Sequence, residues 1–190
     1  MERPERPTAY WLIGPPACGK STWVEKHREL LDAEVISTDD VVEAEAKAQG
    51  ITYDEAIRAM DYDAIVKKLN TKIVKATLAD RNIIFDQTNR DAERRSLFRK
   101  FIPSDYETVG VVFDFDRDVL RERIVEREKR TGKHIPWGVL EKMINELVRP
   151  DMDEFSYEIH VKQDGTQWVS LGRRKSSRNL GRSKQHGTLN

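Results

Sequence analysis

A glycine-rich run near the start of the sequence has the composition and spacing of a phosphate-binding loop. Gly14, Gly19, Lys20 and Ser21 match the pattern G-x-x-x-x-G-K-[ST], between the apolar residues 8–13 and a helical pattern over 20–31. Glycines let backbone N–H groups wrap around phosphates, and the start of a helix adds a positive dipole end. The lysine neutralises phosphate charge, and the serine hydroxyl coordinates Mg²⁺. The run therefore predicts an ATP·Mg²⁺ site; a coincidental strand–turn–helix junction is the alternative.

The predicted ATP-binding residues form one continuous segment that contains a cysteine. They are Gly14, Pro15, Pro16, Ala17, Cys18, Gly19, Lys20, Ser21 and Thr22. A helix N-terminus can lower the pKa of a thiol, so one interpretation of Cys18 is a redox handle. The interpretation that we favour is a small residue that fits the loop.

A second candidate lies where the apolar run 82–85 ends at Asp86. A carboxylate at the carboxyl end of a buried strand is typical of a residue that helps to hold Mg²⁺. The run that ends at Asp114 offers a competing carboxylate, and we rank Asp86 above it. The next polar residues include Thr88 and Asn89, which we expect to face the same site and to bind phosphates or the acceptor.

A third candidate is the pair Asp39-Asp40, which follows the short apolar run 34–37. Transfer of a phosphoryl group to a hydroxyl needs a carboxylate that accepts the proton and orients the oxygen in line with the γ-phosphate. An aspartate in this place is also a good helix N-cap. Both roles can be met, with Asp39 as the catalytic base and Asp40 as the cap.

A basic segment over 123–136 has the features of a lid over the phosphates. Arginines near a glycine-containing turn can stabilise the charge that develops on the transferred group. The alternative is a solvated helix face with weak ion pairs between neighbouring arginines and glutamates. We select Arg130, at the turn, before any upstream arginine.

Short apolar runs alternate with helical patterns along the chain. We expect strands at 8–13, 34–37, 82–85, 108–113 and 157–161, with 166–171 as a further edge strand. Helical periodicity covers 20–31, 38–48, 54–79, 91–101, 116–129 and 139–147. Such alternation predicts an α/β fold with a mostly parallel sheet and helices on both faces.

Composition and length limit the protein class. The 190 residues suit one domain, which we assign to 1–171, and a basic tail at 172–190 that has six Lys and Arg residues and no acidic ones. Such a tail fits nucleic-acid binding or a disordered, solubilising terminus. One cysteine excludes an internal disulfide, and no segment approaches membrane-spanning length. We expect a soluble, intracellular protein, cytoplasmic or nuclear, with no membrane partner.

From about residue 10 to 161 the sequence resembles polynucleotide 5′-hydroxyl kinases of the phage and repair-enzyme type. The matching features are the phosphate loop, Asp39-Asp40, Thr88-Asn89 followed by Glu93-Arg94-Arg95, and the segment from Arg130 to Pro136. The resemblance implies a five-stranded P-loop kinase fold, ATP and Mg²⁺ as cofactors, and a 5′-OH of DNA or RNA as acceptor. By position it also implies that Lys20 and Ser21 bind phosphate and metal, Asp39 is the general base and Arg130 is the lid arginine.

Two positions depart from this family. Phage members have an arginine three residues after the catalytic aspartate, where it grips the phosphate of the acceptor, and this chain has Val42 there. The aspartate of their Asp-Thr-Asn is replaced by Gln87, although Asp86 precedes it.

A second resemblance is to the nucleotide-binding domain of the heterogeneous nuclear ribonucleoprotein U type. It covers residues 84–89 with Arg94-Arg95, then 132–143 and 149–151. Members of that family are RNA- and chromatin-associated proteins that typically lack the acid at the position of Asp39. The presence of Asp39 therefore favours a working kinase.

The sequence as a whole predicts a kinase that transfers the γ-phosphate of ATP to the 5′-OH of RNA or DNA. The assigned roles are Lys20, Asp39 and Arg130 in catalysis, Ser21 and Asp86 at the metal, and Asp40, Thr88, Asn89 and Arg94 at the acceptor. The alternatives are an ATP-binding, RNA-associated module without turnover and a small-molecule kinase similar to zeta toxins.

Overall fold

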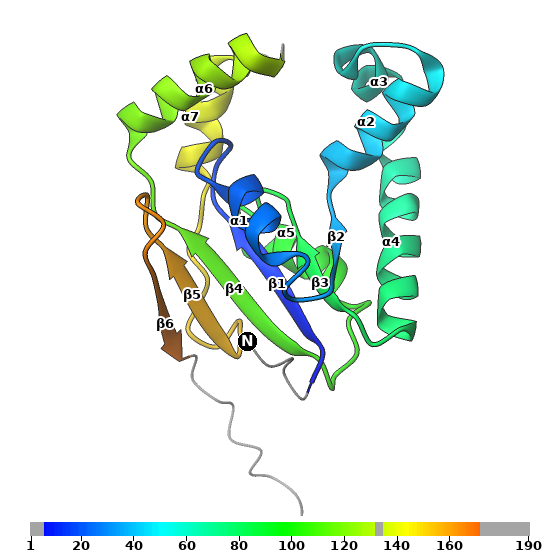
Figure 1. Cartoon of the computed structure of the whole chain (residues 1–190), viewed down its shortest axis with the longest axis vertical. Coiled ribbons are helices and arrows are strands. Elements are labelled where there is room, and N and C mark those ends of the chain that lie inside the picture. The colour runs from blue at the N-terminus through cyan, green and yellow to red at the C-terminus, as the bar shows by residue number, and fades with distance from the viewer. Residues whose placement is uncertain (1–5, 132–134, 172–190) are drawn as a thin grey trace, which may run out of the picture.

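The centre of the molecule is a sheet built from apolar runs, shown in the computed structural model, which describes residues 6–131 and 135–171 (Figure 1). The strands are β1 (Thr8–Ile13), β2 (Ala33–Ile36), β3 (Asn82–Phe85), β4 (Glu107–Phe113), β5 (Tyr157–Val161) and β6 (Gln167–Leu171). Their order is β2-β3-β1-β4-β5-β6, parallel except for the pair β5–β6. The predicted α/β fold with a mostly parallel sheet is confirmed. The sheet of the described residues has six strands rather than five, because β6 adds an antiparallel edge.

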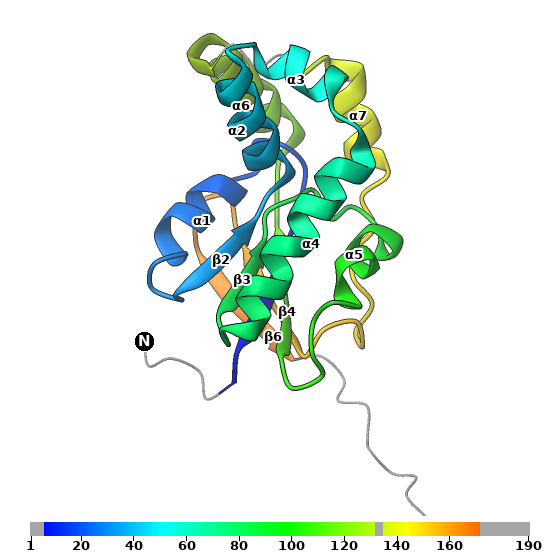
Figure 2. The same cartoon turned by 90° about the vertical axis from the view of Figure 1, so that its right-hand side faces the viewer.

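Helices cover both faces of this sheet. They are α1 (Lys20–His27), α2 (Thr38–Gln49), α3 (Tyr53–Ala59), α4 (Tyr62–Leu78), α5 (Ala92–Arg99), α6 (Arg117–Thr131) and α7 (Trp137–Asn145). Trp11 and Ile13 of β1 pack in one buried cluster with α2, α4 and α5, whereas Tyr10 and Leu12 pack in another with α1, α6 and α7. This division follows from the alternation of side chains along a strand. Figure 2 shows α4 in front of the sheet.

The helix pairs α2–α3 and α6–α7 extend beyond the carboxyl ends of the parallel strands, on opposite sides (Figure 1). None of the helices within 6–131 and 135–171 is long and apolar enough to cross a membrane. The predicted basic tail, 172–190, lies outside the described residues.

The long helix predicted over 54–79 is wrong, because the chain forms two helices there. Thr52 and Glu55 form a reciprocal capping box at the start of α3. Met60 is extended, with φ −76° and ψ 133°, and ends α3. Asp61 then caps α4 by accepting a hydrogen bond from the N–H of Asp63. The apolar period continues through this break, so periodicity alone cannot detect it.

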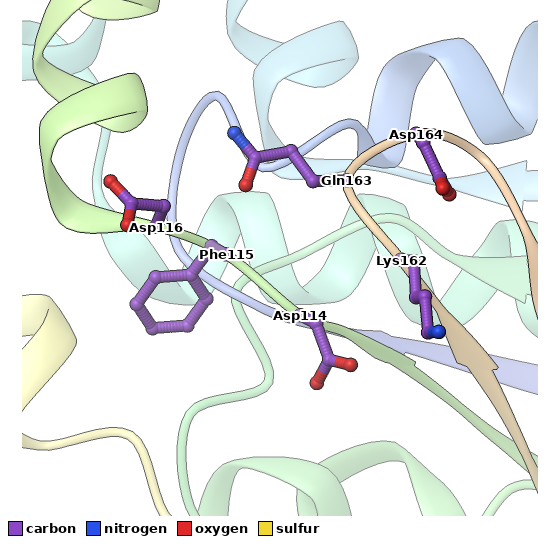
Figure 3. Close-up of a pocket in the computed structure, with 6 residues that line it drawn as sticks. All are labelled: Asp114, Phe115, Asp116, Lys162, Gln163 and Asp164. Carbon is purple, nitrogen blue, oxygen red and sulfur yellow. The ribbon is translucent and has the colours of Figure 1, made fainter.

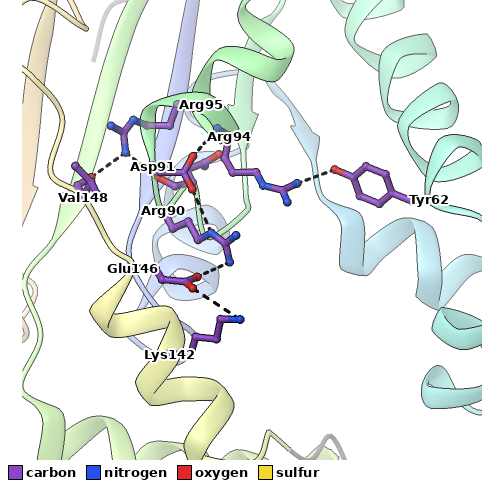
Figure 4. Close-up of polar contacts among 9 residues, drawn as sticks. Tyr62, Arg90, Asp91, Arg94, Arg95, Lys142, Glu146 and Val148 are labelled. Carbon is purple, nitrogen blue, oxygen red and sulfur yellow. Dashed lines mark hydrogen bonds and ion pairs between the residues drawn. The ribbon is translucent and has the colours of Figure 1, made fainter.

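A buried ion pair joins α5 to the segment before β5. The side chain of Arg95 is 1% exposed, and its Nε and Nη2 donate to the two carboxylate oxygens of Glu154 at 2.6 and 2.9 Å. Its Nη1 donates to the carbonyls of Asn89 and Val148 at 3.0 and 2.9 Å (Figure 4). A planar guanidinium suits such a paired geometry. Arg95 therefore fixes the chain directly after the third strand to the last third of the sequence.

Replacing Glu154 by Gln should destabilise the fold strongly, because it leaves a buried guanidinium without a compensating charge. We expect a loss of about 3 kcal/mol, which for a chain of this size lowers the thermal midpoint by roughly 6–12 °C. Thermal unfolding followed by circular dichroism measures the shift. Asp118→Asn, which removes an exposed partner of Arg121, is the matched control and should leave the midpoint nearly unchanged. Equal midpoints for the two variants would contradict the assigned role of Arg95.

Candidate active site

The loop from Gly14 to Gly19 connects the end of β1 to the start of α1. A Cβ on Gly14 would lie 2.6 Å from Sγ of Cys18 and 3.2 Å from Cβ of Phe113, so only glycine fits there. Gly19 has φ +113°, a conformation that side chains rarely adopt, and it begins α1 without a side-chain cap. The first N–H groups of α1 therefore remain as donors for an anion.

The Lys20 side chain folds back over the mouth of this loop. Its Nζ donates to the carbonyls of Gly14 and Pro15 at 2.9 and 2.7 Å. Phosphate oxygens are better acceptors for an ammonium than neutral carbonyls, because the hydrogen bond is then charge-assisted on both sides. The phosphate-neutralising role of Lys20 stays a prediction.

The cysteine of the loop is a packing residue. Cys18 is 5% exposed, and burial, the largest cause, raises the pKa of its thiol although the charge of Lys20 opposes the rise. A protonated, buried thiol is a poor nucleophile. This disfavours the redox interpretation of Cys18 and supports the small residue that fits the loop.

Acidic side chains gather around the end of β3. Burial raises the pKa of Asp86, and the charges of Asp39 and Asp40 raise it further, while Lys20 and then Arg127 lower it. Asp86 is therefore within electrostatic reach of both the loop lysine and the first turn of α2. Asp114, the competing carboxylate, is instead paired with Arg149 at 3.3 Å. The ranking of Asp86 above Asp114 as a metal ligand stays a prediction.

Carboxylate and hydroxyl oxygens are the donors that Mg²⁺ prefers, so Ser21 and Asp86 fit this cation chemically. Among the described residues no three His, Cys, Asp or Glu side chains form a complete metal cage.

The cap of α2 differs from the prediction that Asp40 is the N-cap. Ser37 is extended, with φ −128°, and its Oγ accepts the N–H of Asp40 at 3.2 Å. Ser37 is therefore the cap, and Asp39 and Asp40 lie in the first turn, where the helix dipole favours negative charge. The serine three positions before Asp40 was the available sequence signal.

Two contacts hold the carboxylate of Asp39. The phenolic O–H of Tyr53 donates to its Oδ1 at 2.9 Å, and Nη2 of Arg127 lies 3.8 Å from its Oδ2. Arg123, one helical turn before Arg127, donates to the carbonyl of Ala17 in the loop at 3.4 Å. Sequence reasoning missed Tyr53 and ranked both arginines below Arg130, although their four-residue spacing places them on one face of α6.

Within the described residues, Arg130, the lid arginine selected from the sequence, does not lie with Arg123 and Arg127 beside the phosphate loop and Asp39. Arg130 is exposed on the last turn of α6, beyond Arg127. The predicted turn at 132–134 lies outside the described residues. A role for Arg130 therefore stays a prediction, and Arg123 and Arg127 are the α6 arginines that contact the loop and Asp39.

The residues after β3 separate into buried and exposed positions. Asn89 is 4% exposed, has φ 47°, and donates its amide to the carbonyls of Leu12 and Phe85 at 2.8 and 3.1 Å. It joins the ends of β1 and β3, which corrects the prediction that it contacts the acceptor. Thr88 is half-buried, and its carbonyl accepts the N–H of Gly14 at 3.3 Å.

Arg94 is exposed and directs its guanidinium away from the sheet. Its Nη1 donates to the hydroxyl of Tyr62, at the start of α4, at 3.1 Å (Figure 4). Below it in the figure, Arg90 pairs with Glu146 of the segment that follows α7 at 2.9 Å. Arg94 is the one cation among the four residues predicted to bind the acceptor, and it is exposed next to the start of α4.

A cavity of about 390 Å³ opens beside the phosphate loop. The side chain of Phe113 packs under Gly14 and Gly19, and the cavity begins at the next residue (Figure 3). Its lining residues are Asp114, Phe115, Asp116, Lys162, Gln163 and Asp164. Phe115 is the aromatic residue of this lining, and the other five side chains are polar or charged, three of them aspartates.

Comparisons with known proteins agree with this geometry. A family model described as AAA domain matches residues 10–150. An adenylate kinase of Pseudarthrobacter chlorophenolicus is 28% identical over 133 residues, which are 66% of this chain and 69% of that protein.

Two solved structures have a similar fold. A chain in the Pnkp1/Rnl/Hen1 RNA repair complex superposes with a TM-score of 0.62 at 23% identity. The match covers 75% of the present chain but only 44% of the chain in that complex. A chain of the PezAT chromosomal toxin–antitoxin system of Streptococcus pneumoniae has a TM-score of 0.63 at 14% identity, over 88% and 72% of the two chains. The fold is thus an α/β P-loop NTPase-like fold with a mostly parallel sheet.

Replacing Asp86 by Asn should stabilise the protein alone at neutral pH. Because the folded chain raises the pKa of Asp86, its charged form costs folding free energy, and this cost fades as the pH falls through the raised pKa. The thermal midpoint of Asp86→Asn should therefore exceed that of the natural chain at pH 7, with a difference that shrinks toward about pH 4. The same variant should lose the additional stabilisation that Mg²⁺ gives in the presence of ATP. A lower midpoint at pH 7 would contradict the assignment.

Proposed function

The chain belongs to the AAA domain family, and from this premise we propose that it is an ATP-dependent kinase that transfers the γ-phosphate to a hydroxyl group. The observation that carries the proposal is the meeting of three groups at one edge of the sheet. They are the ammonium of Lys20 on the phosphate loop, the half-buried carboxylate of Asp86 and the exposed carboxylate of Asp39. A phosphate binder, a metal ligand and a base are the parts that phosphoryl transfer requires.

In the proposed reaction, the loop N–H groups and Lys20 bind the β- and γ-phosphates. Ser21 and Asp86 would hold Mg²⁺, which neutralises charge on the phosphate oxygens. The cavity beside Phe113 would accept the base of ATP, because it adjoins the loop and contains the ring of Phe115. Arg123 and Arg127 lie on the side of the loop where they can offset charge on the transferred group.

Asp39 is the proposed general base. As the acceptor oxygen forms its bond to the γ-phosphorus, its proton passes to a carboxylate oxygen of Asp39. The bond between the γ-phosphorus and the β–γ bridging oxygen breaks at the same time, and ADP leaves with that electron pair. The carboxylate also orients the acceptor oxygen, which accounts for a large part of such catalysis.

The proposed acceptor is the 5′-OH end of RNA or DNA. Support comes from the resemblance to polynucleotide 5′-hydroxyl kinases and from a fold neighbour that belongs to an RNA repair complex. Val42 is fully buried, so it cannot replace the phosphate-gripping arginine of the phage members. Arg94 is an exposed cation that would take this role, with Thr88 and Asp40 nearer the reacting groups.

A small hydroxyl compound is the second candidate acceptor, and a charge imbalance favours it. The segment 38–63, which forms α2, α3 and the start of α4, has eight carboxylates against two cations, Lys47 and Arg58. Such a surface repels the phosphates of a polynucleotide. The name of the related adenylate kinase also indicates a small-molecule acceptor for that protein. An ATP-binding module without turnover is disfavoured, because such a module has no use for Asp39.

The test is transfer of labelled γ-phosphate from ATP to 5′-OH RNA, 5′-OH DNA and a panel of nucleosides, nucleotides and sugars. Lys20→Ala should abolish transfer, because it removes the charge that neutralises the phosphates. Asp39→Asn should keep ATP binding and lower turnover by roughly 10²–10⁴-fold, since the amide cannot accept the proton. ATP binding is measured by calorimetry.

The outcomes separate the candidates. Label on oligonucleotides supports the polynucleotide acceptor, and label on a small compound alone replaces it with the second candidate. ATP binding with no labelled product from any acceptor would favour the binding module. Undiminished turnover in Asp39→Asn would exclude Asp39 as the base.

A further inference from the structure

We propose that Tyr53 is the positioning residue of the catalytic base, and that its phenolic O–H fixes one oxygen of Asp39 so that the other receives the proton of the acceptor. This inference rests on the proposed kinase function, in which Asp39 is the base. It adds a residue that the phosphate loop, the metal ligands and the lid arginines do not include.

The geometry divides the two oxygens of Asp39 between different neighbours. Tyr53 donates to Oδ1 at 2.9 Å, a normal hydrogen-bond length. Arg127 lies 3.8 Å from Oδ2, which is close enough to attract the carboxylate but too far for a hydrogen bond. Oδ1 is therefore engaged, and Oδ2 keeps its lone pairs for the acceptor.

Such fixing matters because Asp39 is exposed. Its side chain is 52% exposed, so packing alone does not restrict its rotation. A base must hold its accepting oxygen within hydrogen-bond reach of the acceptor while the γ-phosphate is in line. A single hydrogen bond from a rigid phenol supplies that restraint at one carboxylate oxygen without blocking the other.

The turn between α2 and α3 is built to hold Tyr53 in this place. Gly50 ends α2 with φ 67°, a left-handed conformation that suits glycine, and the N–H of Ile51 bonds back to the carbonyl of Ala46 at 3.0 Å. The capping box of Thr52 and Glu55 then starts α3. Tyr53 is the first residue of α3, so the C-cap of α2 and the capping box of α3 together set its position.

The ring of Tyr53 is anchored in the core while its hydroxyl reaches the site. Tyr53 is partly buried and packs, with Ile51 and Met60, against the buried cluster that includes Trp11 and Phe85. Burial and the charge of Asp39 raise the pKa of this phenol, and the charge of Glu43 adds to the rise, while Arg127 opposes it. The hydroxyl thus stays protonated at neutral pH and acts as a donor, not as a second base.

The test compares Tyr53→Phe with Tyr106→Phe in the full chain. Both substitutions remove one hydrogen-bonded phenolic O–H, but that of Tyr106 donates to the carbonyl of Arg81, away from the site, at 2.9 Å. We expect Tyr53→Phe to lower kcat roughly ten-fold or more, as for loss of a hydrogen bond to a charged group. The KM for ATP and the calorimetric affinity for ATP·Mg²⁺ should stay unchanged, and Tyr106→Phe should keep full turnover.

A double variant separates positioning from a general structural defect. If Tyr53 acts through Asp39, then Tyr53→Phe should cost little further activity in the Asp39→Asn background. A loss of turnover there as large as in the natural background would overturn the inference, as would equal kcat for the two phenylalanine variants or weaker ATP binding in Tyr53→Phe. No transfer by the natural chain to any acceptor would instead refute the proposed function, and the role of Tyr53 with it.

Discussion

Parallel pairing of β1 with both β3 and β4 is the constraint on which the site depends. The register joins Trp11 to Phe85 and Ile13 to Val112, so these strands end nearly level at one edge of the sheet. Ile36 of β2 pairs with Phe85 in the same way. The phosphate loop, Asp86 and the first turn of α2 follow these strand ends directly, and pairing alone brings them together from three parts of the chain. Asn89 reinforces this edge by bonding to the carbonyls at the ends of both β1 and β3.

Carboxylates and cations lie close together at this edge of the sheet, and together they affect the charge state of Asp86. Burial is the main cause of the raised pKa of Asp86, the charges of Asp39 and Asp40 add to it, and the cations Lys20 and Arg127 oppose it. A site that binds both a metal cation and a polyphosphate needs such opposed charges before the ligands arrive. The apolar clusters on the two faces of the sheet supply the folding free energy that offsets the cost of the charged Asp86.

The sequence was sufficient for those features that local spacing determines. The phosphate loop and the strand before it follow from a few adjacent residues, and the alternation of elements predicted the sheet. The break at Met60 was missed because the apolar period continues through it. Tyr53 was missed, and Arg127 was ranked below Arg130, for a different reason: their common partner, Asp39, lies on another helix, and no pattern within one element reports a contact between elements. The burial of Asn89 was likewise invisible, since a polar residue after a strand ordinarily faces solvent.

The network of Arg95 has a consequence for how this chain leaves the ribosome. Its guanidinium is compensated by Glu154, 59 positions later, and it also bonds to the carbonyl of Val148. A nascent chain that ends before these residues would bury a positive charge without a partner if α5 docked on the sheet. Docking of α5 on the sheet is therefore favourable only after the segment that contains Val148 and Glu154 has been synthesised. The last step that closes this face of the sheet thus waits for residues near the end of the domain, even though α5 itself is made much earlier.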